Sequence, residues 1–272
     1  METTVGGLSS IDYDQKRNRY FLVCDDRSSI NPARFYTAKI SIKQNKIDTV
    51  LFTNFAYLKD ELGKTYPSTK ENPYKTPDPE SMRYNPNSKL LVWSSEGENT
   101  IRGKDSILIN PSVYFVNAAG RFKDSITIPQ NLYMSFLEKG PRQNGVLEGM
   151  SYADNYKTLM VNVEEPLQED GPRADLKPNG AIIRFYKFDT QAKTSTNQYA
   201  YELSPVAYAP NPINEYKINS VPEFLWIGNN QLLVLERSYS TGRIACSIKI
   251  FLADYNQATD IANFSSLKAP AK

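Results

Sequence analysis

The sequence contains no histidine among its 272 residues. Without an imidazole, the chain cannot form a Ser-His-Asp or Cys-His catalytic group, a zinc site built on histidine, or a histidine phosphatase centre. Cysteine is almost as scarce, and both copies, Cys24 and Cys246, lie within apolar runs that resemble strands. A free cysteine behaves as a small hydrophobic residue, so these positions predict two buried, unpaired thiols.

Long apolar runs and basic blocks are also missing. No stretch of about 18 apolar residues occurs, which predicts that the chain has no membrane span. The 32 basic and 30 acidic residues give a net charge of +2 without a basic block, so nucleic acid is not expected as a partner. The opening METTVGGLSS lacks the charged-then-apolar pattern of a secretory signal, so any such signal has been removed or was never there.

The most informative feature that is present is a segment of about 70 residues that occurs four times. Its copies begin at Gly6, Asp78, Leu147 and Val221. Each copy reads as a short strand, a turn of Asn, Asp or Gly, a second apolar strand and then a carboxylate. A fixed period built on strand, turn and strand predicts radial or linear repetition, so residues at equivalent positions would form a ring around an axis.

Further strands follow in each copy, giving about four per repeat, and short runs rich in Val, Ile, Tyr and Phe are typical of strands. Four antiparallel strands in each repeat are the blade of a β-propeller. We therefore predict an all-β fold, with residues 1–272 forming a single propeller domain of four-stranded blades. The last strand of the fourth copy, in TDIANFS, is weakly marked. The blades are expected at about 6–58, 78–128, 147–204 and 221–265.

The connections between copies are long, notably at about 59–79 and 129–146. Two of them have apolar spacing that predicts short helical turns, from Phe55 to Lys64 and from Gln130 to Gly140. The chain has no spare strand for closing a ring, and propellers with more than four blades are commoner. We therefore expect either a four-bladed propeller or a piece of a larger one.

Two sets of carboxylates recur in the copies. Glu80, Glu148 and Glu223 begin the first strand of their copies, and Gly7 takes that place in the first copy. The second set closes the second strand and consists of Asp25, Asp26, Glu96, Glu164, Glu165 and Glu236.

A ring of such residues suits a hard cation. Carboxylates packed together repel one another unless a cation or arginines compensate, and several oxygen donors suit Ca²⁺. The alternative is that these carboxylates accept hydrogen bonds from loop backbone N–H groups or pair with nearby arginines.

Arginines accompany the carboxylates. Arg27 and Arg237 follow acidic residues directly, and Arg34 lies in PARFY. Guanidinium groups fork onto phosphate or carboxylate oxygens, which predicts a small anionic substrate such as a phosphate ester. Internal salt bridges to the carboxylates are the alternative. Glu236 and Arg237 are adjacent in a predicted strand, so they should point to opposite faces.

The motifs GGLSSIDYD, FLVCDDRS, DPESMRY, LEGMSYADN, LMVNVEEPLQEDGP and FLWIGNNQLLVLERSYSTG occur in an order that resembles the phytase-like family, also called the esterase-like activity of phytase family. The resemblance covers about residues 6–250. It implies an extracytoplasmic (periplasmic or secreted) β-propeller, with five or six blades in the intact fold, that uses Ca²⁺ to hydrolyse phosphate or other esters. An acidic motif that commonly follows the Leu-Glu-Arg segment in the family, aspartate-asparagine and then Glu-Gly, is absent here, which favours an incomplete ring. By position, the resemblance implies functional roles for Asp25, Arg27, Arg34, Glu80, Glu96, Glu148, Glu164, Glu165, Glu236 and Arg237.

Two functions are consistent with these patterns. In the first, the chain is a Ca²⁺-assisted ester hydrolase. Its catalytic residues are Glu80, Glu148, Arg27 and Arg237; its metal ligands are Asp25, Glu80, Glu96, Glu148, Glu164 and Glu236; and its substrate-binding residues are Arg27, Arg34 and Glu165. In the second, the chain is a non-catalytic extracytoplasmic binding or scaffold propeller, whose recognition surface uses the tyrosines of the connections: Tyr57, Tyr66, Tyr74, Tyr133, Tyr208 and Tyr216.

Overall fold

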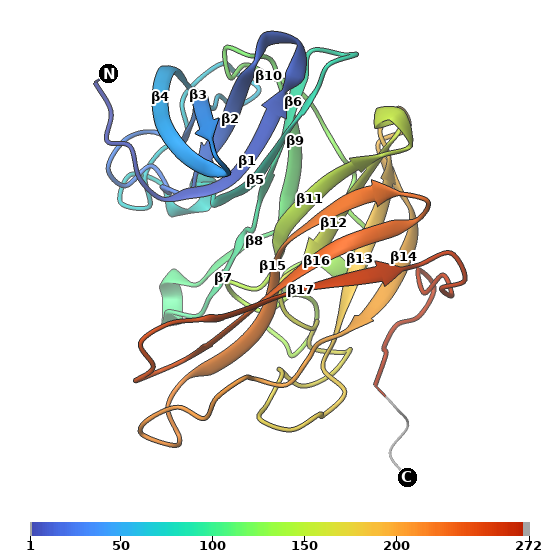
Figure 1. The fold of residues 1–272 in the computed structure, drawn as a ribbon. Helices are drawn as coiled ribbons and strands as arrows, with labels where there is room; N and C mark the ends of the chain where they lie inside the picture. Colours follow the sequence, from blue (N-terminus) through green and yellow to red (C-terminus); the bar gives the residue numbers. More distant parts are fainter. Residues whose placement is uncertain (1, 269–272) are drawn as a thin grey trace. The chain divides into compact units, whose positions relative to one another are not determined.

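The structure is a computed structural model that describes residues 2–268 (Figure 1). Its residues cluster into two compact units. Unit 1 comprises the chain up to Gly97 together with Pro111–Ile126, and unit 2 comprises Glu98–Asn110 together with the chain from Thr127 onward. Almost all regular structure is β-strand, and no helix in residues 2–268 is long and apolar enough to cross a membrane.

Unit 1 contains two antiparallel sheets of four strands. The first has the order β1-β2-β3-β4 and the second β10-β9-β6-β5, so each is a meander in which strands consecutive within the unit pair with each other. The strands are β1 (Leu8–Asp14), β2 (Arg19–Cys24), β3 (Arg34–Lys43), β4 (Lys46–Tyr57), β5 (Pro79–Asn85), β6 (Leu90–Ser95), β9 (Ser112–Val116) and β10 (Phe122–Ser125).

Unit 2 contains a four-stranded sheet of order β11-β12-β13-β14, a three-stranded sheet of order β15-β16-β17, and a two-stranded ribbon, β7-β8. The strands are β7 (Glu98–Thr100), β8 (Ile107–Ile109), β11 (Leu147–Ala153), β12 (Thr158–Val163), β13 (Ile182–Asp189), β14 (Thr194–Glu202), β15 (Lys217–Gly228), β16 (Gln231–Ser240) and β17 (Ser247–Asp254). Within residues 2–268, five short 3-10 turns complete the regular structure: η1 (Gln15–Arg17), η2 (Pro73–Lys75), η3 (Gly103–Asp105), η4 (Gln130–Leu132) and η5 (Asp154–Tyr156).

Local sequence explains the hairpins. Asn229 and Asn230 join β15 to β16, and both have positive φ values, 51° and 55°, a conformation that asparagine tolerates better than most residues. The second strands of two blades are almost entirely buried: every residue of β12 is buried, and in β6 only Leu90 is partly exposed. A strand covered on both faces carries apolar residues at consecutive positions, as residues 159–161 of β12 and 90–93 of β6 do.

The first strands of neighbouring sheets lie side by side within each unit. In unit 1 the N–H of Met82 on β5 donates to Ser10 Oγ on β1 at 2.7 Å. In unit 2 the N–H of Trp226 on β15 donates to Ser151 Oγ on β11 at 3.0 Å. Antiparallel meanders whose first strands lie side by side, as they do within each unit, are propeller blades, and the predicted all-β propeller class is confirmed. The extent of a single domain and the blade number of an intact propeller stay predictions.

The fourth blade has three strands, so the fourth strand expected in TDIANFS is wrong. That segment bonds to the third blade instead. The N–H of Ile261 donates to the carbonyl of Gln198 on β14, and the N–H of Gln198 donates to Asp260 Oδ1, at 2.9 and 3.0 Å. A few residues held in this way cannot also pair with β17.

Of the two predicted helical segments, the first is wrong and the second is correct only for its first turn, η4. Residues 55–57 complete β4, and the chain then turns around Asp60, whose carboxylate accepts the N–H groups of Leu62 and Lys64. In the second segment only η4 is helical. The N–H of Met134 donates to Asn110 Oδ1 at 2.8 Å, which holds the chain in a non-helical path.

The cysteine prediction is correct in part. Both thiols are unpaired and Cys24 is buried, but Cys246 is exposed because β17 begins one residue later, at Ser247.

Candidate functional site

Every blade has an irregularity at the same point of its first strand. One extra residue is inserted there relative to the second strand, and such a bulge re-aims the side chains beside it. In two blades a side chain of the second strand satisfies the bulged backbone: Ser94 Oγ accepts from the N–H of Ser81, and Asn162 Oδ1 accepts from the N–H of Gly149. The pairs that flank the bulges are Leu8 with Cys24, Pro79 with Ser95, Leu147 with Val163, and Ser220 with Arg237.

This register corrects the correspondence expected from the sequence. The residue that enters the bulge is Ser9, Glu80, Glu148 or Val221, so neither Gly7 nor Glu223 is equivalent to Glu80. The repeat appears shifted in the sequence because β15 begins at Lys217, before the Val221 that marks the start of the motif.

The strand register also corrects which residues of the second set of carboxylates are equivalent between the copies. On the second strand, the residues paired beside the bulges are Cys24, Ser95, Val163 and Arg237. The residue that follows each of them is Asp25, Glu96 or Glu164 in three blades but Ser238 in the fourth. Glu236 therefore has the position of Ser94 and Asn162 within β16, rather than that of Glu96.

Unit 1 brings three carboxylates together. Asp78, Glu80 and Glu96 each present an oxygen atom, and these atoms lie within 4.8 Å of one another. The backbone explains the cluster, because the N–H of Glu96 donates to the carbonyl of Asp78 at 3.1 Å, and Glu80 follows Asp78 by two residues and so shares its face. Asp78 and Glu96 are 8% and 4% exposed, and Glu80 is half-buried.

Burial and like charge act together on Glu80. Desolvation and the neighbouring carboxylates of Glu96, Asp78 and Asp25 raise the pKa of Glu80 to about 9, although a hydrogen bond from Ser9 Oγ at 2.7 Å opposes the shift. At neutral pH this group therefore retains a proton unless a cation supplies the compensating charge.

Arg27 and Asp25 border the cluster. Arg27 Nε lies 3.6 Å from Asp78 Oδ2, with about a quarter of its side chain exposed. Burial and the adjacent Asp26 raise the pKa of Asp25. Gly7, at φ +55°, lies against the Asp25 carboxylate, and a Cβ there would meet Asp25 Oδ1 and displace the carboxylate.

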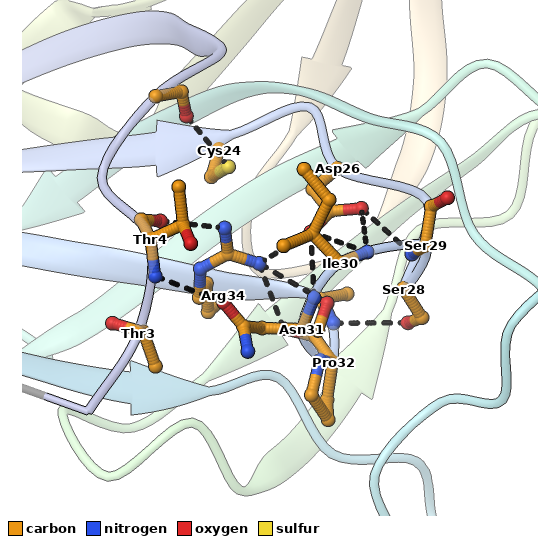
Figure 2. A network of polar contacts seen from close by, with 12 residues as sticks. Thr3, Thr4, Cys24, Asp26, Ser28, Ser29, Ile30, Asn31, Pro32 and Arg34 are labelled. Carbon is orange, nitrogen blue, oxygen red and sulfur yellow. Dashed lines mark hydrogen bonds and ion pairs between the residues drawn. The ribbon is translucent and has the colours of Figure 1, made fainter.

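Arg34 has a different environment from Arg27. Figure 2 shows the polar contacts that surround the Arg34 guanidinium. Its guanidinium is 1% exposed and donates to Asp26 Oδ2 at 2.7 Å, to Tyr36 Oη at 2.6 Å and to the carbonyl of Thr4 at 2.9 Å. Asp26 in turn accepts the N–H groups of Ser29 and Asn31. These contacts support the alternative of an internal ion pair for Arg34.

In unit 2, two adjacent carboxylates hold two arginines. Glu164 Oε1 accepts from Ser220 Oγ at 2.7 Å and from Arg237 Nη2 at 3.2 Å, and Glu165 pairs with Arg173 Nε. Burial raises the pKa of Glu164, and its bonds to Ser220 and Arg237 offset part of that shift. Nearly half of each arginine side chain, 47%, is exposed.

The other glutamates of unit 2 are placed separately. Glu236 is buried and accepts from Tyr201 Oη, from Asn219 Nδ2 and from the N–H of Ser204. Arg237 lies on the opposite, more exposed face of β16, which confirms the expectation that these neighbours diverge. Glu148 is half-buried on β11 and Glu223 half-buried on β15. A ring joining all four copies stays a prediction.

Two residues of the unit 1 cluster were not among the predicted ligands. Asp78 begins the second copy and lies two residues before Glu80, a spacing that places both on one strand face and could have identified it. Ser9 was indistinguishable from an ordinary strand residue, because its role depends on β1 and β5 being adjacent.

The donor set of the cluster fits a hard cation. Three carboxylates supply only oxygen ligands and as many as three negative charges, which is the chemistry that Ca²⁺ prefers. Ca²⁺ accepts about six to eight oxygen ligands, so three carboxylates do not fill its coordination shell.

Comparison with known proteins places these observations in context. The family described as "Phytase-like: Esterase-like activity of phytase" matches residues 3–271. No match was found among curated proteins.

Solved structures resemble the chain at low sequence identity. A GH43_12 protein retrieved from capybara gut metagenome is 14% identical with a TM-score of 0.50, and the match covers 92% of this chain and 40% of that one. The periplasmic gluconolactonase of Pseudomonas aeruginosa is 9% identical with a TM-score of 0.41, covering 93% and 74% of the two chains. The chain thus spans less than half the length of the first protein. The first likeness concerns the fold alone.

Proposed function

Because the chain belongs to the Phytase-like family, we propose that it is a Ca²⁺-assisted hydrolase of phosphate or other esters centred on unit 1. The observation that supports this proposal is the approach of the Asp78, Glu80 and Glu96 carboxylates to within 4.8 Å of one another. A bound divalent cation would polarise a phosphoryl or carbonyl oxygen and lower the pKa of a water molecule, so the chemistry needs no histidine.

The residues of unit 1 have separate roles in this proposal. Asp78, Glu80 and Glu96 hold the cation, and Ser9 orients Glu80 through its 2.7 Å hydrogen bond. Arg27, 3.6 Å from Asp78 and partly exposed, is placed to bind an anionic oxygen of the substrate. The predicted roles of Glu148, Glu164, Glu165, Glu236 and Arg237 in the same reaction remain part of the proposal, as does an extracytoplasmic location.

Calorimetric titration of the purified chain with Ca²⁺ is the first test. Glu80→Gln and Glu96→Gln should each weaken binding at least about tenfold, because each removes a charged ligand. Glu61→Gln, an exposed acidic change in the same unit, is the control. Failure of the wild-type chain to bind Ca²⁺ at millimolar concentration would refute the metal-assisted mechanism.

Hydrolysis is tested with p-nitrophenyl phosphate and p-nitrophenyl acetate, with and without a chelator. Turnover that disappears with the chelator and returns with Ca²⁺ supports the hydrolase. Arg27→Met should raise KM for the phosphate ester more than for the acetate, since only the phosphate is anionic.

The second candidate is a non-catalytic binding or scaffold propeller, and exposed aromatics favour it. Of the tyrosines predicted to form a recognition surface, Tyr74, Tyr133, Tyr208 and Tyr216 are exposed, whereas Tyr57 and Tyr66 are half-buried and Tyr66 packs on Trp93. Ca²⁺ that raises thermal stability without turnover of either ester would favour this candidate.

A further inference from the structure

Unit 2 contains a cavity of about 520 Å³ that none of the proposed catalytic residues line. One wall is the connection around Asn131 and Tyr133, another is the segment 262–265, and Gln198 of β14 lies between them. The volume is in the range of small-molecule sites.

A buried arginine fixes two of these walls. Arg184 on β13 donates two bonds to the Asp170 carboxylate, at 2.6 and 2.8 Å. It also donates to the carbonyls of Ile261 and Phe264, at 3.2 and 2.9 Å, and to Gln198 Oε1 at 2.9 Å. The cavity is therefore built on a satisfied ion pair rather than on mobile surface side chains.

Arg184 also determines how two amides are oriented. A guanidinium only donates hydrogen bonds, so Gln198 must turn its oxygen towards Arg184. The same oxygen accepts from Asn131 Nδ2 at 2.8 Å, which in turn directs Asn131 Oδ1 away from Gln198. If the Gln198 amide were flipped, its NH₂ group would face the donors of Arg184 and Asn131. If the Asn131 amide were flipped, its oxygen would face the Gln198 oxygen.

One of these two amides presents a donor to the cavity. Gln198 lines the cavity, its oxygen is engaged by Arg184 and Asn131, and among the bonds formed by residues 2–268 none uses its Nε2. Asn131 Oδ1 is buried, so a ligand in the cavity does not reach it. The cavity therefore offers one amide N–H donor of fixed orientation.

We propose that this cavity binds a neutral saccharide unit. The oxygen of a sugar hydroxyl accepts hydrogen bonds, so it can accept from the Gln198 Nε2 donor. Tyr133 and Phe264, 46% and 50% exposed, offer aromatic surface to the apolar face of a pyranose, and Met134 adds apolar wall. Lys139 and Glu169 also line the cavity and balance in charge, so a neutral ligand fits better than an anion.

This inference is independent of the ester hydrolase, because the lining residues belong to unit 2 and the carboxylate cluster to unit 1. The test is calorimetry and saturation-transfer NMR on the full chain with methyl glucoside, methyl galactoside and methyl xyloside. At least one glycoside should bind at millimolar concentration. Gln198→Glu retains an acceptor for Arg184 but replaces the free donor, so it should weaken binding at least about tenfold.

Tyr133→Ala and Phe264→Ala keep the proposal testable if the Gln198 variant folds poorly, since both side chains are exposed. Each should weaken binding several-fold, whereas Tyr208→Ala, which removes an exposed tyrosine outside the cavity, should not. Absence of binding by all three glycosides, or binding unaltered in the cavity variants, would overturn the proposal. Binding of N-methylacetamide in place of the glycosides would also overturn it, since the site would then recognise amides.

Discussion

Ser9 Oγ donates a 2.7 Å hydrogen bond to Glu80 Oε2, and these two residues occupy the same bulge position in consecutive copies of the repeat. Equivalent positions of neighbouring blades are thus in direct contact in unit 1. In this pair the repeat has diverged into a hydroxyl that donates and a carboxylate that accepts, and the hydrogen bond fixes the orientation of the Glu80 carboxylate.

The raised pKa of Glu80 has a consequence for stability. An ordinary glutamate in the unfolded chain loses its proton near pH 4.5, whereas the folded chain retains it to about pH 9. The unfolded state therefore binds fewer protons between these values, and the free energy of unfolding should fall as pH rises through this window.

Glu80→Gln should remove that decline. With a chelator present, urea unfolding at about pH 5 and about pH 8 should show the wild type losing more than about 1 kcal/mol across the interval and the variant losing less. Ca²⁺ should restore the wild type at the higher pH. If the free energy of unfolding fell equally with pH in the wild type and the variant, the raised pKa would not belong to Glu80.

The ion pair of Asp26 and Arg34 should stabilise unit 1 at neutral pH. Burial by itself raises the pKa of Asp26, but Arg34 and the backbone N–H groups outweigh it and hold the pKa below the ordinary 3.8. The contribution of this ion pair to the free energy of unfolding is therefore fully present above pH 3.8. It is lost as the pH falls through the lower pKa that Asp26 has in the folded chain.

Asp26→Asn should cost about 2–4 kcal/mol at neutral pH, because it leaves the Arg34 guanidinium buried without its counter-charge. The matched control is Lys43→Gln, which breaks the exposed Lys43–Asp48 pair and should cost less than about 1 kcal/mol. Urea unfolding measures both. Similar small losses would show that the network in Figure 2 contributes little.

Gly120 is expected to be intolerant of a side chain. It has φ +72°, and a Cβ there would overlap the carbonyl oxygen of Tyr57 at the end of β4. Gly63 has a similar φ, +76°, but open space around it. Gly63→Ala should cost about 1–2 kcal/mol from backbone strain alone, and Gly120→Ala at least about 2 kcal/mol more. Thermal unfolding measures both variants. The loss in Gly63→Ala reports backbone strain, and the additional loss in Gly120→Ala reports the collision with Tyr57.

Glu236 should act on stability rather than on Ca²⁺ affinity. Its carboxylate already accepts from Tyr201 Oη at 2.9 Å and Asn219 Nδ2 at 2.8 Å, and Glu236→Leu would leave both donors buried without it. The expected cost is about 2–4 kcal/mol in urea unfolding. A loss of Ca²⁺ binding as large as that of Glu80→Gln would restore Glu236 to the set of metal ligands.

The sequence by itself determined the four repeats, the antiparallel blades and the carboxylates Glu80 and Glu96, because strand periodicity and turn residues are local signals. It misplaced the fourth repeat, since the equivalence of positions depends on bulges, and a bulge is recognised only from strand pairing. It misread TDIANFS as a strand, because nothing local indicates that Asp260 and Ile261 bond to Gln198.

Only the tertiary structure decided which charged residues meet. Arg27 and Arg34 are alike in sequence, yet Arg27 lies beside Asp78 with part of its side chain exposed and Arg34 is buried against Asp26. The same is true of the hydrogen-bonded amides of Asn131 and Gln198, which are 67 residues apart. Contacts of this kind join distant parts of the chain, and their partners are determined by packing rather than by the neighbouring sequence.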